Sequence, residues 1–85
     1  MQERKRGDNG MKFYVDEMEF RKSMLEKNYK TIEALSADCG VNRNTIGETL
    51  SGKSRPSSTV IEKIAATLEL SGADIGRIFF ATKIA

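Results

Sequence analysis

Apolar residues recur at intervals of three and four positions along most of the chain after residue 16. Residues at these intervals share one face of an α-helix, whereas strict alternation would indicate a strand. The recurring apolar positions are Phe20, Met24, Ile32, Leu35, Cys39, Ile46, Leu50, Ile61, Ile64, Ala65, Leu68, Ile75, Ile78 and Phe79. The pattern predicts an all-α fold in which short helices turn one face toward a shared core, with no sheet.

Capping residues and helix breakers divide this pattern into five helices. Residue types that cap a helix N-terminus precede four of the apolar stretches, at Asp16, Thr31, Asn42 and Ser57 or Ser58. Gly40 ends the second stretch, because glycine adopts a left-handed backbone without strain. The predicted helices span residues 16–28, 31–39, 42–51, 57–69 and 73–80.

The residues before the first helix differ in composition. Residues 1–10 are polar and charged, include the basic cluster Arg4-Lys5-Arg6, and end in a turn-like Gly-Asp-Asn-Gly sequence. Residues 12–15 are β-prone, which predicts either an edge strand or an extended arm packed on the first helix. We therefore expect a flexible basic tail or arm over residues 1–15 and one domain over residues 16–85.

The second and third predicted helices are joined by a tight turn and followed by a basic loop. Gly40 and Val41 form the turn, and the loop contains Lys53 and Arg55. This is the layout of a helix-turn-helix, in which the second helix of the motif lies in the major groove of DNA. The sequence therefore predicts a DNA-binding domain.

Residues 16–80 resemble the Cro/C1-type helix-turn-helix family, the small phage-repressor and Xre-like regulators. The most specific part is GVNRNTI followed by SGKSRPS. The residues that carry the resemblance are Thr31, Leu35, Gly40, Val41, Arg43, Thr45, Ile46, Ser51, Gly52, Lys53, Pro56, Ser57, Ile64, Ala65 and Leu68. The resemblance implies a five-helix, lambda-repressor-like domain and a bacterial or phage-encoded regulator, repressor or Cro-like, acting on a DNA operator.

The chain departs from the family pattern at two positions. Family members often carry Gln at the first residue of the second helix, where its side chain binds a phosphate, and this chain has Ile32. Gly47 is unusual inside a recognition helix, because glycine there costs about 1 kcal/mol relative to alanine. Both departures bear on DNA affinity rather than on the fold.

The predicted third helix buries Ile46 and Leu50, so its opposite face is expected to contact DNA bases. The candidate base contacts are Arg43, Asn44, Gly47 and Glu48. Arginine can donate two bonds to guanine, asparagine can pair with adenine, and glutamate can accept from cytosine N4. Gly47 would allow close approach of the helix backbone. The alternatives are solvated surface residues, a surface salt bridge or phosphate repulsion for Glu48, and drift for Gly47.

Helix N-termini and the basic loop are expected to hold phosphates, which position a domain on DNA without reading its sequence. The candidate phosphate contacts are Thr31, Asn42, Lys53, Arg55 and Ser57. The alternative for the two basic side chains is a loop that is charged for solubility alone.

Composition narrows the function without identifying it. The net charge is only +2, from 14 basic and 12 acidic side chains, so the placement of charge matters more than its sum. The chain has no histidine and one cysteine, which leaves no paired nucleophile and no zinc spacing. We expect no enzyme activity, no metal or cofactor and no small-molecule ligand. The absence of a long apolar run or signal peptide predicts a cytoplasmic protein.

Two classes of function remain after these exclusions. The first is a sequence-specific DNA-binding regulator that acts as a homodimer, at least on DNA. The second is a protein-interaction module of the same fold, antitoxin-like or regulator-binding. The C-terminal segment provides candidate dimer contacts at Ile78, Phe80 and Ile84. Alternatively, Phe80 and Ile84 fold back on the first helix or on Phe13 and Tyr14.

Overall fold

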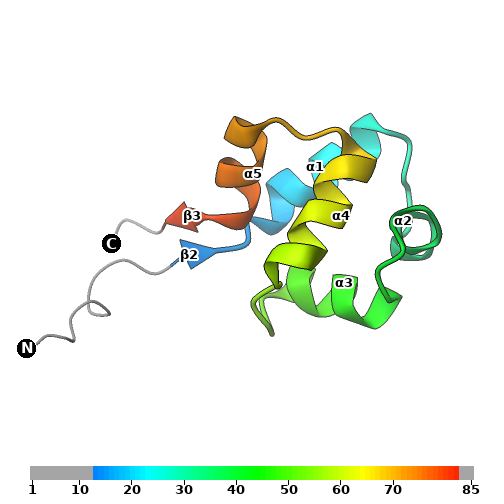
Figure 1. Cartoon of the computed structure of the whole chain (residues 1–85), viewed down its shortest axis with the longest axis horizontal. Helices are drawn as coiled ribbons and strands as arrows, with labels where there is room; N and C mark the ends of the chain where they lie inside the picture. The colour runs from blue at the N-terminus through cyan, green and yellow to red at the C-terminus, as the bar shows by residue number, and fades with distance from the viewer. Residues whose placement is uncertain (1–12, 83–85) are drawn as a thin grey trace, which may run out of the picture.

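The computed structural model describes residues 13–82, and within them it contains five helices and one short two-stranded ribbon (Figure 1). The helices are α1 (Glu17–Glu26), α2 (Ile32–Cys39), α3 (Arg43–Ser51), α4 (Ser58–Leu68) and α5 (Gly72–Phe79). The all-α prediction is confirmed, and each helix lies where the sequence pattern placed it. The predicted tail falls mostly on residues 1–12, outside the described residues, as does Ile84.

Local side-chain chemistry explains where the helices begin. The side chains of Asp16, Thr31, Asn42 and Ser57 each accept a hydrogen bond from a backbone N–H in the first turn of the helix that follows. In α5, Ser71 and Asp74 cap each other, the hydroxyl accepting from one backbone N–H and the carboxylate from the other. These bonds satisfy backbone groups that a helix start leaves unpaired.

The core lies between the helices and contains the apolar positions that the sequence pattern predicted, except that Ile32 and Ile75 are only partly buried and pack against its edge. Phe20 of α1 and Phe79 of α5 are fully buried, with ring centroids 5.5 Å apart in an edge-on arrangement. Figure 1 shows α4 between α5 and α2, with α3 across its lower end. Four residues of α4 are buried: Ile61, Ile64, Ala65 and Leu68. This packing fixes α2 and α3 relative to the rest of the domain.

The structure contains a ribbon, of which the sequence analysis offered only the first strand, as one of two alternatives. β2 (Phe13–Tyr14) pairs antiparallel with β3 (Ala81–Thr82), so that Phe13 lies opposite Thr82. The expectation of no sheet was therefore too strict, and the open choice at residues 12–15 resolves to an edge strand for Phe13 and Tyr14. The strands meet because α1 and α5 pack together, and the backbone N–H of Asp16 donates to the carbonyl of Ile78 at 2.7 Å.

The C-terminal candidate dimer contacts need a correction. Ile78 is 0% exposed and belongs to the core, so its side chain does not face a partner. Phe80 is 42% exposed and packs edge-on against Phe13, with ring centroids 5.7 Å apart. Phe80 therefore folds back on the segment before α1, as the alternative in the sequence analysis proposed.

The helices are also too short or too polar for a bilayer. Within residues 13–82, none has the length and apolar character that crossing a membrane requires.

Candidate nucleic-acid interface

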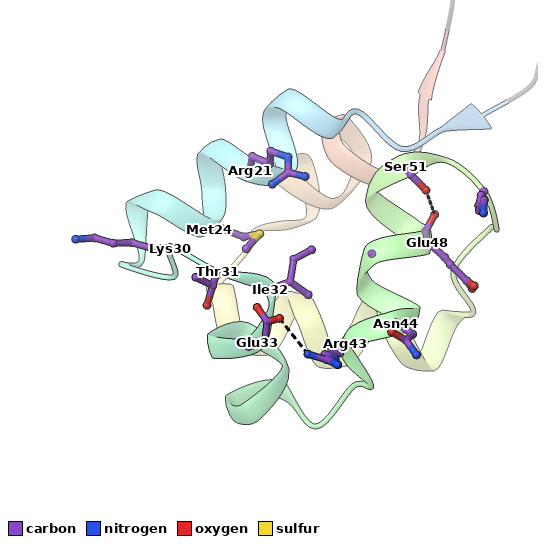
Figure 2. A pocket seen from close by; sticks show the side chains of 12 residues that line it. Arg21, Met24, Lys30, Thr31, Ile32, Glu33, Arg43, Asn44, Glu48 and Ser51 are labelled. Atoms are coloured by element: carbon purple, nitrogen blue, oxygen red, sulfur yellow. Dashed lines mark hydrogen bonds and ion pairs between the residues drawn. The ribbon is translucent and has the colours of Figure 1, made fainter.

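The exposed face of α3 borders an open hollow that α1 and the start of α2 complete (Figure 2). The hollow has a volume of about 750 Å³. The residues that line it are Arg21, Met24, Lys30, Thr31, Ile32, Glu33, Arg43, Asn44, Gly47, Glu48, Ser51 and Lys53. All four candidate base contacts are thus on one concave surface, together with two of the candidate phosphate contacts, Thr31 and Lys53.

The sequence of α3 explains why this face is polar. Ile46 and Leu50 point into the core, and Thr49 is also fully buried. The Thr49 hydroxyl donates to the carbonyl of Thr45 at 2.9 Å, so its burial leaves no unpaired donor. With these side chains inward, the opposite side of the helix carries the polar residues.

The turn between α2 and α3 is held by defined contacts. Gly40 has φ +77°, a left-handed conformation that favours glycine. The hydroxyl of Ser36 donates to the carbonyl of Val41 at 2.6 Å, and Val41 is buried. These contacts fix the path of the chain from the end of α2 to the start of α3.

Arg43 is paired across the motif. Its Nη1 donates to Oε2 of Glu33 at 3.2 Å, and the two side chains are 64% and 63% exposed. Figure 2 shows the Arg43 side chain turned toward α2 and the dashed contact to Glu33. Sequence reasoning missed Glu33, because ten positions separate it from Arg43 and no single-helix spacing predicts that contact.

Asn44 and Glu48 project from α3 away from α2 (Figure 2). The backbone N–H of Asn44 donates to Oδ1 of Asn42 at 2.7 Å. The side-chain amide of Asn44 has no hydrogen-bond partner among residues 13–82. Glu48 likewise has no ion-pair partner in the described part of the chain, so the salt-bridge alternative for Glu48 has no support there. A Cβ atom added at Gly47 would meet nothing within 4 Å, so packing inside the chain does not require glycine at this position.

The candidate phosphate contacts separate into two groups. Lys53 lines the hollow, and Thr31 caps α2 at its rim, where its hydroxyl accepts from Ala34 N–H at 3.1 Å. Asn42, Arg55 and Ser57 are exposed but do not line the hollow. The guanidinium of Arg55 lies 4.7 Å from the ring centroid of Phe80, against the ribbon.

The charge on the hollow favours an anionic partner. The cationic side chains that line it are Arg21, Lys30, Arg43 and Lys53, against the carboxylates Glu33 and Glu48. Arg21 belongs to α1, and Lys30 precedes Thr31, the cap of α2. Neither was among the candidate DNA contacts predicted from the sequence. Among residues 13–82, no three His, Cys, Asp or Glu side chains form a group that could hold a metal ion.

Comparison with known proteins gives one match. A family model described as helix-turn-helix matches residues 22–75, more than half of the chain, from within α1 to within α5. No curated protein and no solved structure matches the chain.

Proposed function

The chain belongs to the Cro/C1-type helix-turn-helix family of DNA-binding regulatory domains, and from that membership we propose that it is a sequence-specific transcriptional repressor or Cro-like regulator. In this proposal α3 lies in the major groove and reads bases, while the rim of the hollow and the loop after α3 hold the phosphates. Bound at an operator, the protein would act by occupying DNA that other proteins need.

The strongest support for this proposal comes from the residues exposed on the first turn of α3. Arg43 and Asn44, on the first turn of α3, are exposed on the same surface as Gly47 and Glu48, and the core uses neither side chain. The N-terminal residues of a recognition helix reach base edges most directly. Arginine and asparagine are also the side chains best suited to guanine and adenine.

Two copies of the chain are part of the proposal. One recognition helix contacts only a few base pairs, so specific control by such a small domain needs a second copy on a near-palindromic site. The centres of the half-sites would lie about one helical turn apart, roughly 34–36 Å. Phe80 remains the candidate contact between copies, with Ile84 outside the described residues.

A protein-interaction module is the second candidate, and two observations favour it. Ile32 stands at the first residue of α2 in place of a phosphate-binding glutamine, and the carboxylates of Glu33 and Glu48 lie on the face that would meet DNA. Both carboxylates repel phosphates. A domain that binds protein instead would enrich no sequence from a pool of DNA.

The test is selection of duplexes from a random pool by the purified chain, followed by fluorescence anisotropy with the enriched duplex. We expect one enriched motif. Arg43→Ala and Asn44→Ala should each weaken binding to it by about 1–3 kcal/mol and relax the preference at one base pair. Lys63 is an exposed cation of α4 outside the hollow. Lys63→Ala is therefore the matched control for the loss of one positive charge in Arg43→Ala.

Two results would count against the proposal. A pool from which no sequence is enriched would favour the interaction module. Enrichment with unchanged binding of both α3 variants would show that another surface reads the DNA.

A further inference from the structure

Glu33 is the acidic residue that pairs with Arg43 at the start of α3, and fold stability does not account for this pairing. Both side chains are mostly exposed, and exposed ion pairs contribute little to stability. Glu33 lies in the first turn of α2, where the helix dipole favours an anion. Arg43 is the first residue of α3, where the dipole disfavours a cation. The fold alone gives no reason for a cation at that position.

The contact engages only one part of the guanidinium. Glu33 accepts from Nη1 of Arg43, and among residues 13–82 no acceptor contacts Nε or Nη2. The edge formed by Nε and Nη2 can donate two parallel hydrogen bonds. It can therefore meet O6 and N7 of guanine while Nη1 stays on the carboxylate.

From this geometry we infer that Glu33 is the positioning residue for Arg43 and that it sets the ratio of specific to non-specific DNA binding. The inference rests on the proposed function and adds a specificity-determining residue to it. The carboxylate holds the guanidinium in one orientation, so less side-chain freedom is lost when guanine is bound.

The same carboxylate lowers the affinity for DNA without the motif. When no guanine lies opposite, the paired Arg43 and Glu33 carry no net charge together, so the pair gives no attraction to a phosphate. Phosphate contacts supply most of the binding energy on non-specific DNA, so loss of one cation matters most there. A phosphate that approached Arg43 directly would also be repelled by Glu33.

The test compares Glu33→Gln with the wild type on two duplexes, the enriched motif and a scrambled duplex of equal length and composition. Glutamine keeps the size of the side chain and one acceptor oxygen but removes the charge. We expect binding to the scrambled duplex to tighten roughly three- to tenfold. Its salt slope should steepen by about one unit as Arg43 becomes available to a phosphate. Binding to the enriched motif should tighten by a smaller factor or weaken, so the specificity ratio falls.

Two further variants isolate the local effect from the change in net charge. Glu62→Gln removes a carboxylate of α4 that is exposed, lies outside the hollow and has no ion-pair partner among residues 13–82. It should change both affinities by the same small factor. In an Arg43→Ala background, Glu33→Gln should change the affinities for both duplexes by one common factor and leave the specificity ratio unchanged, because the residue it positions is gone. Circular dichroism melts should show all variants folded.

The outcomes separate this inference from the proposed function. If the wild type enriches no sequence, both are overturned. If it enriches a motif and Glu33→Gln matches Glu62→Gln on both duplexes, the role of Glu33 is overturned and the proposed function stands. A change in specificity ratio that persists without Arg43 would also overturn it, because Glu33 would then act on the DNA directly.

Discussion

Lys53 and Arg55 are two positions apart in one loop, yet the fold uses them differently. Lys53 lines the hollow beside α3, and its backbone N–H donates to the carbonyl of Glu48 at 2.9 Å. Arg55 stacks on Phe80, and an exposed cation–π contact of this kind contributes about 0.5–1 kcal/mol. We expect Arg55 to leave that contact when it reaches a phosphate, whereas Lys53 makes no cation–π contact or ion pair within residues 13–82.

This difference leads to a prediction for DNA binding. Lys53→Ala should weaken binding to the enriched duplex and to the scrambled duplex by the same factor. It should also lower the salt slope of binding by about one unit. Arg55→Ala should lower the slope less and should also reduce the melting temperature of the free protein. Anisotropy titrations at several salt concentrations measure the first effect, and thermal unfolding measures the second. A change of base preference in the Lys53 variant would refute its assignment to a phosphate.

At the scale of single residues, the sequence predicted which face of α3 is exposed but not the charged residues of other helices that lie beside it. Arg43, Asn44 and Glu48 could be placed because the helical period of α3 fixes which side faces out. Glu33 could not be assigned to Arg43, because their contact depends on the angle between two helices. That angle results from packing in the core and from the Gly40 turn.

Helix boundaries were predictable because they depend on neighbouring residues. The capping side chains act three residues ahead or fewer, so a sequence shows both partners of each bond. The ribbon is the opposite case. Ala81 and Thr82 carry no strand pattern, and they pair with Phe13 and Tyr14 only because α1 and α5 bring the two segments together.

The cap of α5 leads to a prediction for pH. Hydrogen bonds from the Ser71 backbone and hydroxyl, with a further one from Arg77, hold the pKa of Asp74 below its ordinary value of 3.8. Because the folded pKa is the lower one, the carboxylate stabilises the fold fully above the ordinary pKa. That stabilisation is lost as pH falls through the folded pKa. We expect wild-type stability to fall on acidification below about pH 4.

Asp74→Asn should lose less stability than the wild type over the same acid range, because asparagine does not titrate. Urea unfolding at pH 3 and at pH 6 gives the loss of unfolding free energy for each protein. The quantity to compare is the difference between these two losses. Each protein also loses stability on acidification at Glu69, because Lys27 lowers the pKa of Glu69. Taking the difference removes this shared contribution. Parallel pH profiles of variant and wild type would show that Asp74 is not responsible.

At the scale of the whole molecule, the C-terminal end as far as residue 82 offers less apolar surface than the sequence suggested. Ile78 and Phe79 are in the core, and Phe80 is partly covered by Phe13 and Arg55 of its own chain. Stable interfaces usually bury about 1,200–2,000 Å² in total. We therefore expect the free protein to sediment as a monomer at micromolar concentration and two copies to bind together only on the operator.

Phe80→Ser tests which surface joins the two copies on DNA. If Phe80 lies between them, the variant should lose cooperativity on the full operator and keep its affinity for a single half-site. Leu25→Ser, which removes an exposed apolar side chain of α1, is the matched control. A wild-type protein that is dimeric without DNA would contradict the expected monomer. Unchanged cooperativity in the Phe80 variant would place the contact elsewhere.

The ribbon also determines how the domain would respond to mechanical tension. Phe13 and Thr82 face each other at its outer end, so a force pulling these two residues apart acts on their pairing first and then on Tyr14 and Ala81. The strands would peel open one pair at a time, the geometry that resists least. The next load would fall on the contact between α1 and α5, while α2, α3 and α4 lie off the line of force. We therefore expect tension between Phe13 and Thr82 to open the ribbon first and the surface proposed to read DNA among the last.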